Sequence, residues 1–163
     1  IAMIDNSVLK SEIVESRFDI CLTSLKVEEV SAQHSSYPVS NAIDGDPSTI
    51  WHTPWGENAP KHPHFIIINF GKILSMKGFS YLPRTDGQLG GICKHYKVEV
   101  SQDGIIWNFV KSGSFDNIRN NPVKQEIRFE RITNAQYLRF TSLSNVDDTE
   151  TFSAAELGPI ILY

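Results

Sequence analysis

The chain has 163 residues, of which 40% are hydrophobic and 10% aromatic, and its formal net charge is −4. This size and apolar content suit one domain with a substantial core, so a second domain is not required. The acidic balance argues against a nucleic-acid partner, because nucleic-acid affinity comes largely from clustered Lys and Arg, and no apolar run approaches the roughly 20 residues that span a bilayer.

Two segments differ in pattern at the start of the chain. Residues 1–24 mix apolar and charged side chains with only a weak helical rhythm, so we interpret them as an N-terminal arm or linker. They do not match a signal peptide, and we expect a mature fragment or an excised module. From Leu25 onward, Leu25, Val27 and Val30 alternate with charged residues, which is typical of a half-buried strand. Residues 25–163 are therefore the expected folded domain.

The most specific stretch, residues 41–55, follows this first predicted strand. Gly45 and Pro47 exclude a helix interior and predict a tight loop. Such a loop can turn carbonyl oxygens inward beside the Asp44 carboxylate and the Thr49 hydroxyl, and calcium prefers a set of oxygen ligands. It is not an EF-hand, because Thr49 stands where that motif needs glycine. From the residues alone, a calcium loop and an Asx turn between strands both remain open.

A series of short β-type runs occupies the rest of the chain. They are rich in β-branched and aromatic residues, and an Asp-Gly hairpin signal stands between two of them. The runs cover residues 64–71, 73–74, 78–83, 96–100, 105–110, 123–129, 137–140 and 157–163. With no convincing helix between them, this spacing predicts an all-β sandwich or barrel.

Three side chains in the predicted loops suit a ligand site. His52 and Trp55 flank Pro54, and Arg84 follows a predicted strand end. In a sandwich the loops carry function, and an aromatic face can pack on the C–H patch of a sugar while His and Arg bond its hydroxyls. Each residue also has a structural alternative. Trp55 could cover a sandwich edge, His52 could bond a carbonyl, and Arg84 could pair with Asp86.

No motif of catalysis is present. Residues 78–82 lack the closing glycine of a nucleophile elbow, and the histidines and cysteines have neither H-E-x-x-H nor paired C-x-x-C spacing. Asp147, Asp148 and Glu150 cluster in sequence, and we interpret them as a solvated turn. We therefore expect the chain itself to have no enzymatic activity.

The chain has two cysteines, Cys21 and Cys93. Two cysteines permit one disulfide without requiring it. A disulfide here would close a long loop, yet Cys21 lies in the N-terminal arm, so a disulfide and two buried thiols both remain open.

Several motifs occur in the order found in a known family. They are N-A-I-D-G-D at 41–46 running into W-H-T, L-P-R-T-D-G at 82–87, V-E-V-S-Q-D-G at 98–104 and A-A-E-L at 154–157. They resemble the successive motifs of the discoidin, or F5/8 type C, domain, and are most similar to family 32 carbohydrate-binding modules. The resemblance spans about residues 25–163 and implies a single-domain, discoidin-like jelly-roll β-sandwich.

This resemblance implies a sugar site. The positions that match His52 and Arg84 contact sugar in the family, and an aromatic near Trp55 provides a stacking platform. A second aromatic before the A-A-E motif corresponds to Phe152, and two Asn residues of a polar loop could add amide hydrogen bonds. The expected ligand-binding residues are His52, Trp55, Arg84, Asn120, Asn121 and Phe152.

The resemblance also implies one structural calcium ion. Its ligands would be carbonyl oxygens, one hydroxyl and two carboxylates, and it would tie the 41–49 loop to the last strand without taking part in catalysis. The expected metal ligands are Asn41, Asp44, Asp46, Thr49, Ala155 and Glu156.

The function that the resemblance implies is non-catalytic recognition of terminal galactose-type sugars, galactose or N-acetylgalactosamine. The domain would be secreted, periplasmic or at the cell surface, covalently linked to a glycoside hydrolase. Discoidin-like domains also bind phospholipid or protein surfaces, although polar, mostly acidic or neutral loops argue against an anionic membrane. A structural accessory domain of an enzyme is the third alternative.

Overall fold

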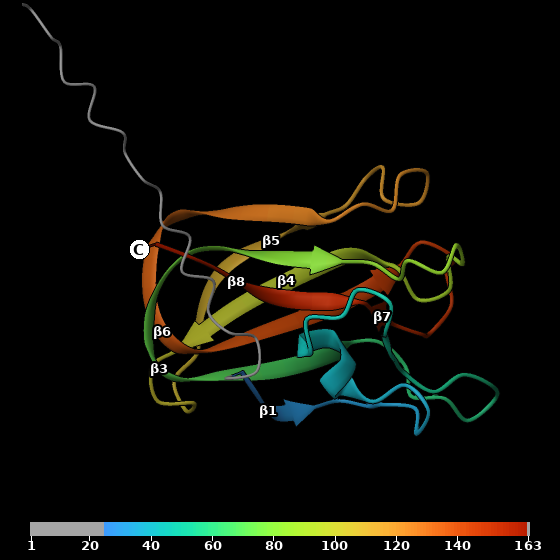
Figure 1. Ribbon diagram of the computed structural model, residues 1–163, viewed down its shortest axis with the longest axis horizontal. Helices are drawn as coiled ribbons and strands as arrows, with labels where there is room; N and C mark the ends of the chain where they lie inside the picture. The colour runs from blue at the N-terminus through green and yellow to red at the C-terminus, as the bar shows by residue number, and fades with distance from the viewer. Residues whose placement is uncertain (1–24, 163) are drawn as a thin grey trace, which may run out of the picture.

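The computed structural model describes residues 25–162 as a β-sandwich with almost no helix (Figure 1). Its elements are β1 (Lys26–Val30), the 3-10 helix η2 (Val39–Ile43), β2 (Trp51–His52), β3 (His64–Leu82), β4 (Cys93–Ser101), β5 (Asn108–Ser114), β6 (Gln125–Asn145), β7 (Ser153–Ala154) and β8 (Glu156–Ile161). The larger sheet has the order β1-β3-β6-β4-β5, with β8 also paired to β3, and β2 pairs with β7 in a second sheet. The predicted all-β sandwich is confirmed, whereas the expected arm, residues 1–24, lies outside the described residues.

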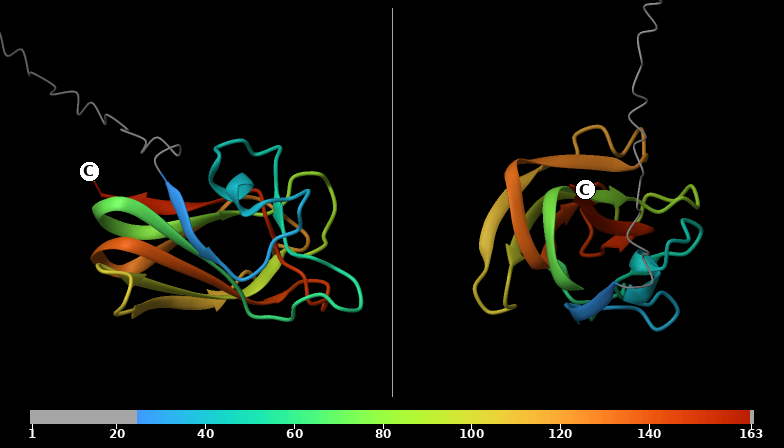
Figure 2. Two further views of the ribbon diagram at one scale, coloured as in Figure 1. Left: turned by 90° about the horizontal axis from the view of Figure 1, so that it is seen from below. Right: turned by 60° about the vertical axis from the view of Figure 1, so that its left-hand side comes forward.

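Strands β3 and β6 are long and bent, and they pair antiparallel along most of their length. Their register shifts between Asn69 and Leu74, next to Gly71, whose φ of +71° suits glycine. The bend lets one strand serve two layers, because the first part of β3 pairs with β1 and the last part with β8 (Figure 2). The predicted runs 64–71 and 73–74 and all but the last residue of 78–83 therefore belong to one strand, β3.

The core follows from the alternation of these strands. Ile66 and Ile68 of β3 point inward with 0% exposure, and aromatic rings fill the space between the layers. The buried Tyr81 hydroxyl donates to the Ser153 carbonyl at 2.9 Å and accepts the Cys93 N–H at 3.0 Å. Burial raises the pKa of Tyr81 well above its ordinary value. Tyr81 thus ties β3 to β4 and β7, the strands from which the ligand-side loops depart.

The hairpin between β4 and β5 corrects one predicted strand. The run expected at 105–110 becomes a strand only at Asn108, and Ile105 and Ile106 are 81% and 67% exposed. The reason is local, because the Asp103 carboxylate accepts the N–H groups of both isoleucines and Gly104 turns the chain at φ +76°. The predicted turn is confirmed. It lies at the end of the sandwich opposite β2 and β7 (Figure 2).

Candidate functional site

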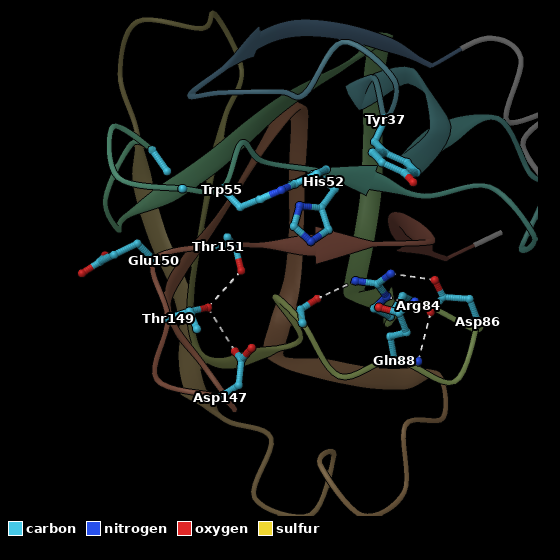
Figure 3. A pocket seen from close by; sticks show the side chains of 13 residues that line it. Tyr37, His52, Trp55, Arg84, Asp86, Gln88, Asp147, Thr149, Glu150 and Thr151 are labelled. Atoms are coloured by element: carbon cyan, nitrogen blue, oxygen red, sulfur yellow. Dashed lines mark hydrogen bonds and ion pairs between the residues drawn. The ribbon is translucent and has the colours of Figure 1, made fainter.

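A pocket of about 550 Å³ opens at the loop end of the sandwich (Figure 3). Four segments far apart in sequence form it. Its lining comes from Tyr37, from the stretch 52–59, from the loop 84–90 that follows β3, and from residues 147–151 between β6 and β7. The volume is within the range typical of small-ligand sites. Three of the predicted ligand-binding residues, His52, Trp55 and Arg84, line it together.

His52 presents a hydrogen-bond acceptor to this pocket. Its side chain is only 6% exposed, and its Nδ1 lies 2.6 Å from the Thr53 carbonyl oxygen. A carbonyl can only accept, so Nδ1 carries the proton and Nε2 of the neutral ring is an acceptor. Burial lowers the pKa of His52, which favours this neutral form. No residue in the range 25–162 hydrogen-bonds Nε2, and Figure 3 shows the ring between Trp55 and Arg84.

Arg84 presents donors from a fixed position. Its Nε and Nη2 donate to the two carboxylate oxygens of Asp86 at 2.8 and 2.6 Å, and Nη1 donates to the Gly90 carbonyl at 3.1 Å. The guanidinium lowers the pKa of Asp86 through these hydrogen bonds. The alternative of an Arg84–Asp86 pair is therefore realised, yet it does not exclude a ligand role. A guanidinium has five N–H donors, and three of them are engaged.

Trp55 supplies the aromatic wall. Its ring is 54% exposed and stacks on the imidazole of His34, with ring centroids 4.3 Å apart and an interplanar angle of 12°. His52 meets the indole edge-on at 5.2 Å. Because these contacts fix the orientation of the indole while leaving over half its surface open, Trp55 can act as a platform.

Tyr37 is a pocket residue that the sequence analysis did not identify. It is 38% exposed, and its ring centroid lies 6.2 Å from that of Trp55. The only signal in the sequence is an aromatic residue before Pro38 in a polar loop, which does not distinguish a ligand contact from a turn residue.

Two carboxylates also belong to the lining, Asp147 and Glu150. The Asp147 carboxylate accepts the Thr149 hydroxyl at 3.2 Å, and Glu150 accepts the His62 N–H at 3.0 Å. Neither forms an ion pair with Lys or Arg within residues 25–162. The three acidic residues lie in a turn, as predicted, but Asp147 and Glu150 also line the pocket, whereas Asp148 does not.

Three predicted ligand-binding residues lie elsewhere. Phe152 is 0% exposed and packs on Trp51 with ring centroids 4.8 Å apart, so its assignment as a second platform is wrong. The backbone N–H and carbonyl of Phe152 bond Thr53, and its ring packs in the core, while the preceding Thr151 lines the pocket. Asn120 and Asn121 are exposed in a turn after β5 and do not line the pocket.

A second polar arrangement lies in the 41–49 loop. The Thr49 hydroxyl is 2.8 Å from the Asp44 carboxylate, 3.1 Å from the Asp46 carbonyl and 3.4 Å from the Asn41 carbonyl. The N–H groups of Thr49 and Asp46 also donate to the Asp46 carbonyl and the Asp44 carboxylate, respectively. Each of these oxygens has more than one lone pair, so acceptor sites still outnumber the donors. This is the chemistry that a hard cation needs, and these four residues fit the expected calcium ligands.

The Asp46 carboxylate itself turns out of this group of oxygens. It accepts the backbone N–H and the hydroxyl of Ser48 at 2.9 and 2.6 Å, and these hydrogen bonds lower the pKa of Asp46. Asp46 therefore offers its carbonyl oxygen to the loop, as the resemblance implies.

The other two expected metal ligands, Ala155 and Glu156, lie where β7 gives way to β8, and β8 packs against η2. Glu156 accepts a hydrogen bond from Lys124 Nζ at 2.6 Å, while the Ala155 N–H donates to the Leu82 carbonyl and leaves its own carbonyl available. Within residues 25–162 no three His, Cys, Asp or Glu side chains gather at a metal-binding distance. A cation here would thus be held mainly by carbonyl and hydroxyl oxygens.

Comparison with known proteins identifies the family. Residues 26–157 match the F5/8 type C domain. The chain belongs to this family. The F5/8 type C match covers most of the described chain, so the discoidin-like jelly roll implied by the sequence motifs is confirmed.

Relatives of this F5/8 type C domain include enzymes and isolated binding modules. It is 34% identical over 140 residues to galactose oxidase of Gibberella zeae, covering 78% of this chain and 20% of that protein, so the chain spans about a fifth of that relative. It is 32% identical to a family 32 carbohydrate-binding module from a family 31 glycoside hydrolase of Clostridium perfringens, with a TM-score of 0.79 and coverage of 88% and 94%. A further Clostridium perfringens module, in complex with GalNAc-β-1,3-galactose, is 27% identical with a TM-score of 0.74 and coverage of 86% and 97%. The domain is thus of the family 32 carbohydrate-binding type.

Proposed function

We propose that this F5/8 type C domain is a non-catalytic module that binds terminal galactose or N-acetylgalactosamine in the pocket of His52, Trp55 and Arg84. One observation carries the proposal. Two separate loops, one with His52 and Trp55 and the other with Arg84, supply an acceptor, an aromatic surface and a donor to one pocket. The bound disaccharide of the similar Clostridium perfringens module supports the sugar class.

The recognition chemistry follows from these groups. The apolar C–H face of a galactose ring packs on the exposed indole, and its axial hydroxyl leaves that face continuous. A sugar hydroxyl donates to His52 Nε2, and a second hydroxyl accepts from the remaining N–H groups of Arg84. Because the pocket is open to water, we expect weak monosaccharide binding, with a Kd on the order of 0.1–1 mM.

Calcium is the second part of the proposal. We expect one ion held by the carbonyls of Asn41 and Asp46, the Asp44 carboxylate and the Thr49 hydroxyl, with Ala155 and Glu156 completing the set. Its role would be structural, because the ion would close the loop 41–49 onto the start of β8. The convergence of oxygens on Thr49 supports it.

The proposed setting is a secreted or cell-surface glycoside hydrolase that carries this domain as an accessory module. The parentage of the similar module from a family 31 glycoside hydrolase supports this setting. Within residues 25–162 no helix is long and apolar enough to cross a membrane.

Calorimetric titration with galactose, N-acetylgalactosamine and glucose tests the sugar assignment. We expect saturable binding of the first two and at least several-fold weaker binding of glucose, since the anchors would read the axial hydroxyl. Liposome sedimentation in parallel tests the membrane alternative. Liposome binding without any response to sugars would contradict the proposal and favour a lipid-binding role.

A further inference from the structure

We propose that the pocket also sorts galactose-type sugars by charge, preferring a protonated amino sugar and disfavouring a carboxylated or sulfated one, with Asp147 as the specificity-determining residue. The inference rests on the proposed sugar-binding function and specifies its ligand class. It concerns the side of the pocket formed by residues 147–151, which lies across from Tyr37 (Figure 3).

The charges that line the pocket do not balance. Arg84 and Asp86 neutralise each other through two hydrogen bonds of 2.8 and 2.6 Å. The remaining charged lining residues are Asp147 and Glu150, both acidic and both without an ion pair in residues 25–162. The only cation in the pocket lining is Arg84, and Asp86 already neutralises it. The charges of Asp147 and Glu150 are therefore not offset.

The two acidic residues are not equivalent. Glu150 is exposed, and its carboxylate is held by the backbone N–H of His62 at the outer side of the pocket. Asp147 is half-buried, and its negative charge acts on the buried ring of His52. A charge that is partly removed from water is screened less than one at the surface. Asp147 should consequently dominate the discrimination.

The buried imidazole is an independent sign that the ligand must supply donors. His52 is 6% exposed, and its Nε2 has no partner among the described residues and faces the pocket. A neutral ring with Nδ1 bonded to a carbonyl can only accept at Nε2. The positive charge of Arg84 further lowers the pKa of His52, whereas the negative charge of Asp147 raises it. Desolvation is the largest cause, so the ring remains an acceptor.

An ammonium group satisfies this arrangement and a carboxylate does not. An ammonium carries three donors and a positive charge, so it can bond an acceptor and lie near Asp147 at once. A carboxylate has acceptors only, so it can bond the free N–H groups of Arg84 but not His52 Nε2, and it carries the same charge as Asp147. The charge of Asp147 and the hydrogen-bond acceptor of His52 therefore both favour an ammonium group over a carboxylate.

Three sugars that share the axial hydroxyl test the proposal on the intact chain. At pH 6, galactosamine is cationic, galactose is neutral and galacturonic acid is anionic. We expect galactosamine to bind roughly threefold to tenfold more tightly than galactose, and galacturonic acid to bind more weakly by a similar factor. The differences should shrink in about 1 M salt, where the Debye length is near 3 Å. Equal affinities for the three sugars would overturn the proposal.

Two neighbouring aspartates provide a matched pair of variants. Asp147→Asn removes the charge and keeps an oxygen that can accept the Thr149 hydroxyl, while Asp148→Asn removes the same charge outside the pocket. Asn also tolerates the positive φ of 54° at position 148. The ratio of galactosamine to galactose affinity should fall to about one in Asp147→Asn and stay at the wild-type value in Asp148→Asn.

The possible results distinguish a failure of the charge preference from a failure of the proposed galactose-binding function. A ratio unchanged in Asp147→Asn, with a native circular dichroism spectrum, would overturn the charge-sorting role and leave the galactose module standing. Failure of the wild type to bind any of the three sugars would overturn the proposed function and, with it, this inference.

Discussion

The pocket and the 41–49 loop are both polar and loop-borne, but their hydrogen-bonding groups are arranged in opposite ways. In the pocket, His52 Nε2 and the remaining donors of Arg84 face open space. In the loop, oxygens of three residues converge on the single hydroxyl of Thr49. Unused donors and acceptors together suit a ligand with several hydroxyl groups, whereas an excess of acceptors around one point suits a metal cation. Asp and Thr residues occur in both sites, which differ mainly in whether their polar atoms face an open pocket or converge on one point.

The largest effect should come from removing calcium. A ligand bound only by the native state stabilises it by about 2.7 kcal/mol at 100 times its Kd, so chelation should lower the Tm and added calcium should restore it. Differential scanning calorimetry of the wild type in excess chelator and in excess calcium measures this.

Two variants sharpen the calcium test. Thr49→Val removes the hydroxyl at the centre of the oxygens and should abolish the response to calcium. Ser48→Ala removes a neighbouring hydroxyl that bonds only the Asp46 side chain among the described residues, and should keep the response. If neither chelator nor calcium changed the Tm of the wild type, the proposed calcium site in the 41–49 loop would be contradicted.

Replacement of Arg84 should affect mainly the pocket. Arg84→Lys keeps the charge but cannot make the two-pronged bond to Asp86 together with the bond to Gly90. We expect galactose binding to weaken by roughly 1.5–3 kcal/mol, the usual contribution of a charged donor. Titration calorimetry measures it. Arg128→Lys, at an exposed arginine outside the pocket, is the control and should bind galactose as the wild type does.

A smaller effect should appear as a pH dependence of stability. Burial lowers the pKa of His52 and of His64, which is 1% exposed and contacts the Glu150 carbonyl through Nε2 at 2.6 Å. In the unfolded chain both should titrate near 6.5, so below that pH the unfolded state binds more protons than the native state. The stability is therefore fully present above about pH 6.5 and is lost as the pH falls below it.

Urea unfolding at pH 7.5 and 5.5 checks this sign. We expect a lower free energy of unfolding at pH 5.5, and a reduced difference in His52→Gln. His95→Gln changes an exposed histidine and should leave the difference unchanged. Equal or greater stability at pH 5.5 would contradict the neutral, buried state of these rings.

Local patterns predicted much of the sheet. The alternation at Leu25–Val30, the dense run 64–71 and the Asp103-Gly104 turn all have the predicted structure. The joining of two runs into the single strand β3 could not be predicted, because register shifts and a glycine bend leave no periodic signal across residues 69–78. Residues 105–107 have high β-propensity, but they do not form a strand because the Asp103 carboxylate accepts the N–H groups of Ile105 and Ile106.

The site was predictable only where a single loop or a family motif pointed to it. His52, Trp55 and Arg84 were identified in this way, and the structure brings them together. Asp147 and Tyr37 were missed as pocket residues, because long-range contacts such as the His52 N–H to Tyr37 carbonyl bond and the β2–β7 pairing have no signal in a single sequence. Phe152 was misplaced because one sequence does not reveal which side chains of a short connecting segment turn toward the core.

The most direct test of the sugar site compares two exposed aromatic residues. Trp55 is 54% exposed and lines the pocket, whereas Phe109 is 62% exposed on β5 and does not. NMR titration of the wild type, Trp55→Ala and Phe109→Ala with galactose should show at least a tenfold loss of affinity, about 1.4 kcal/mol, for Trp55→Ala only. Each variant should unfold within about 0.5 kcal/mol of the wild type, as surface substitutions usually do. Wild-type affinity in Trp55→Ala would contradict the account and place the sugar elsewhere.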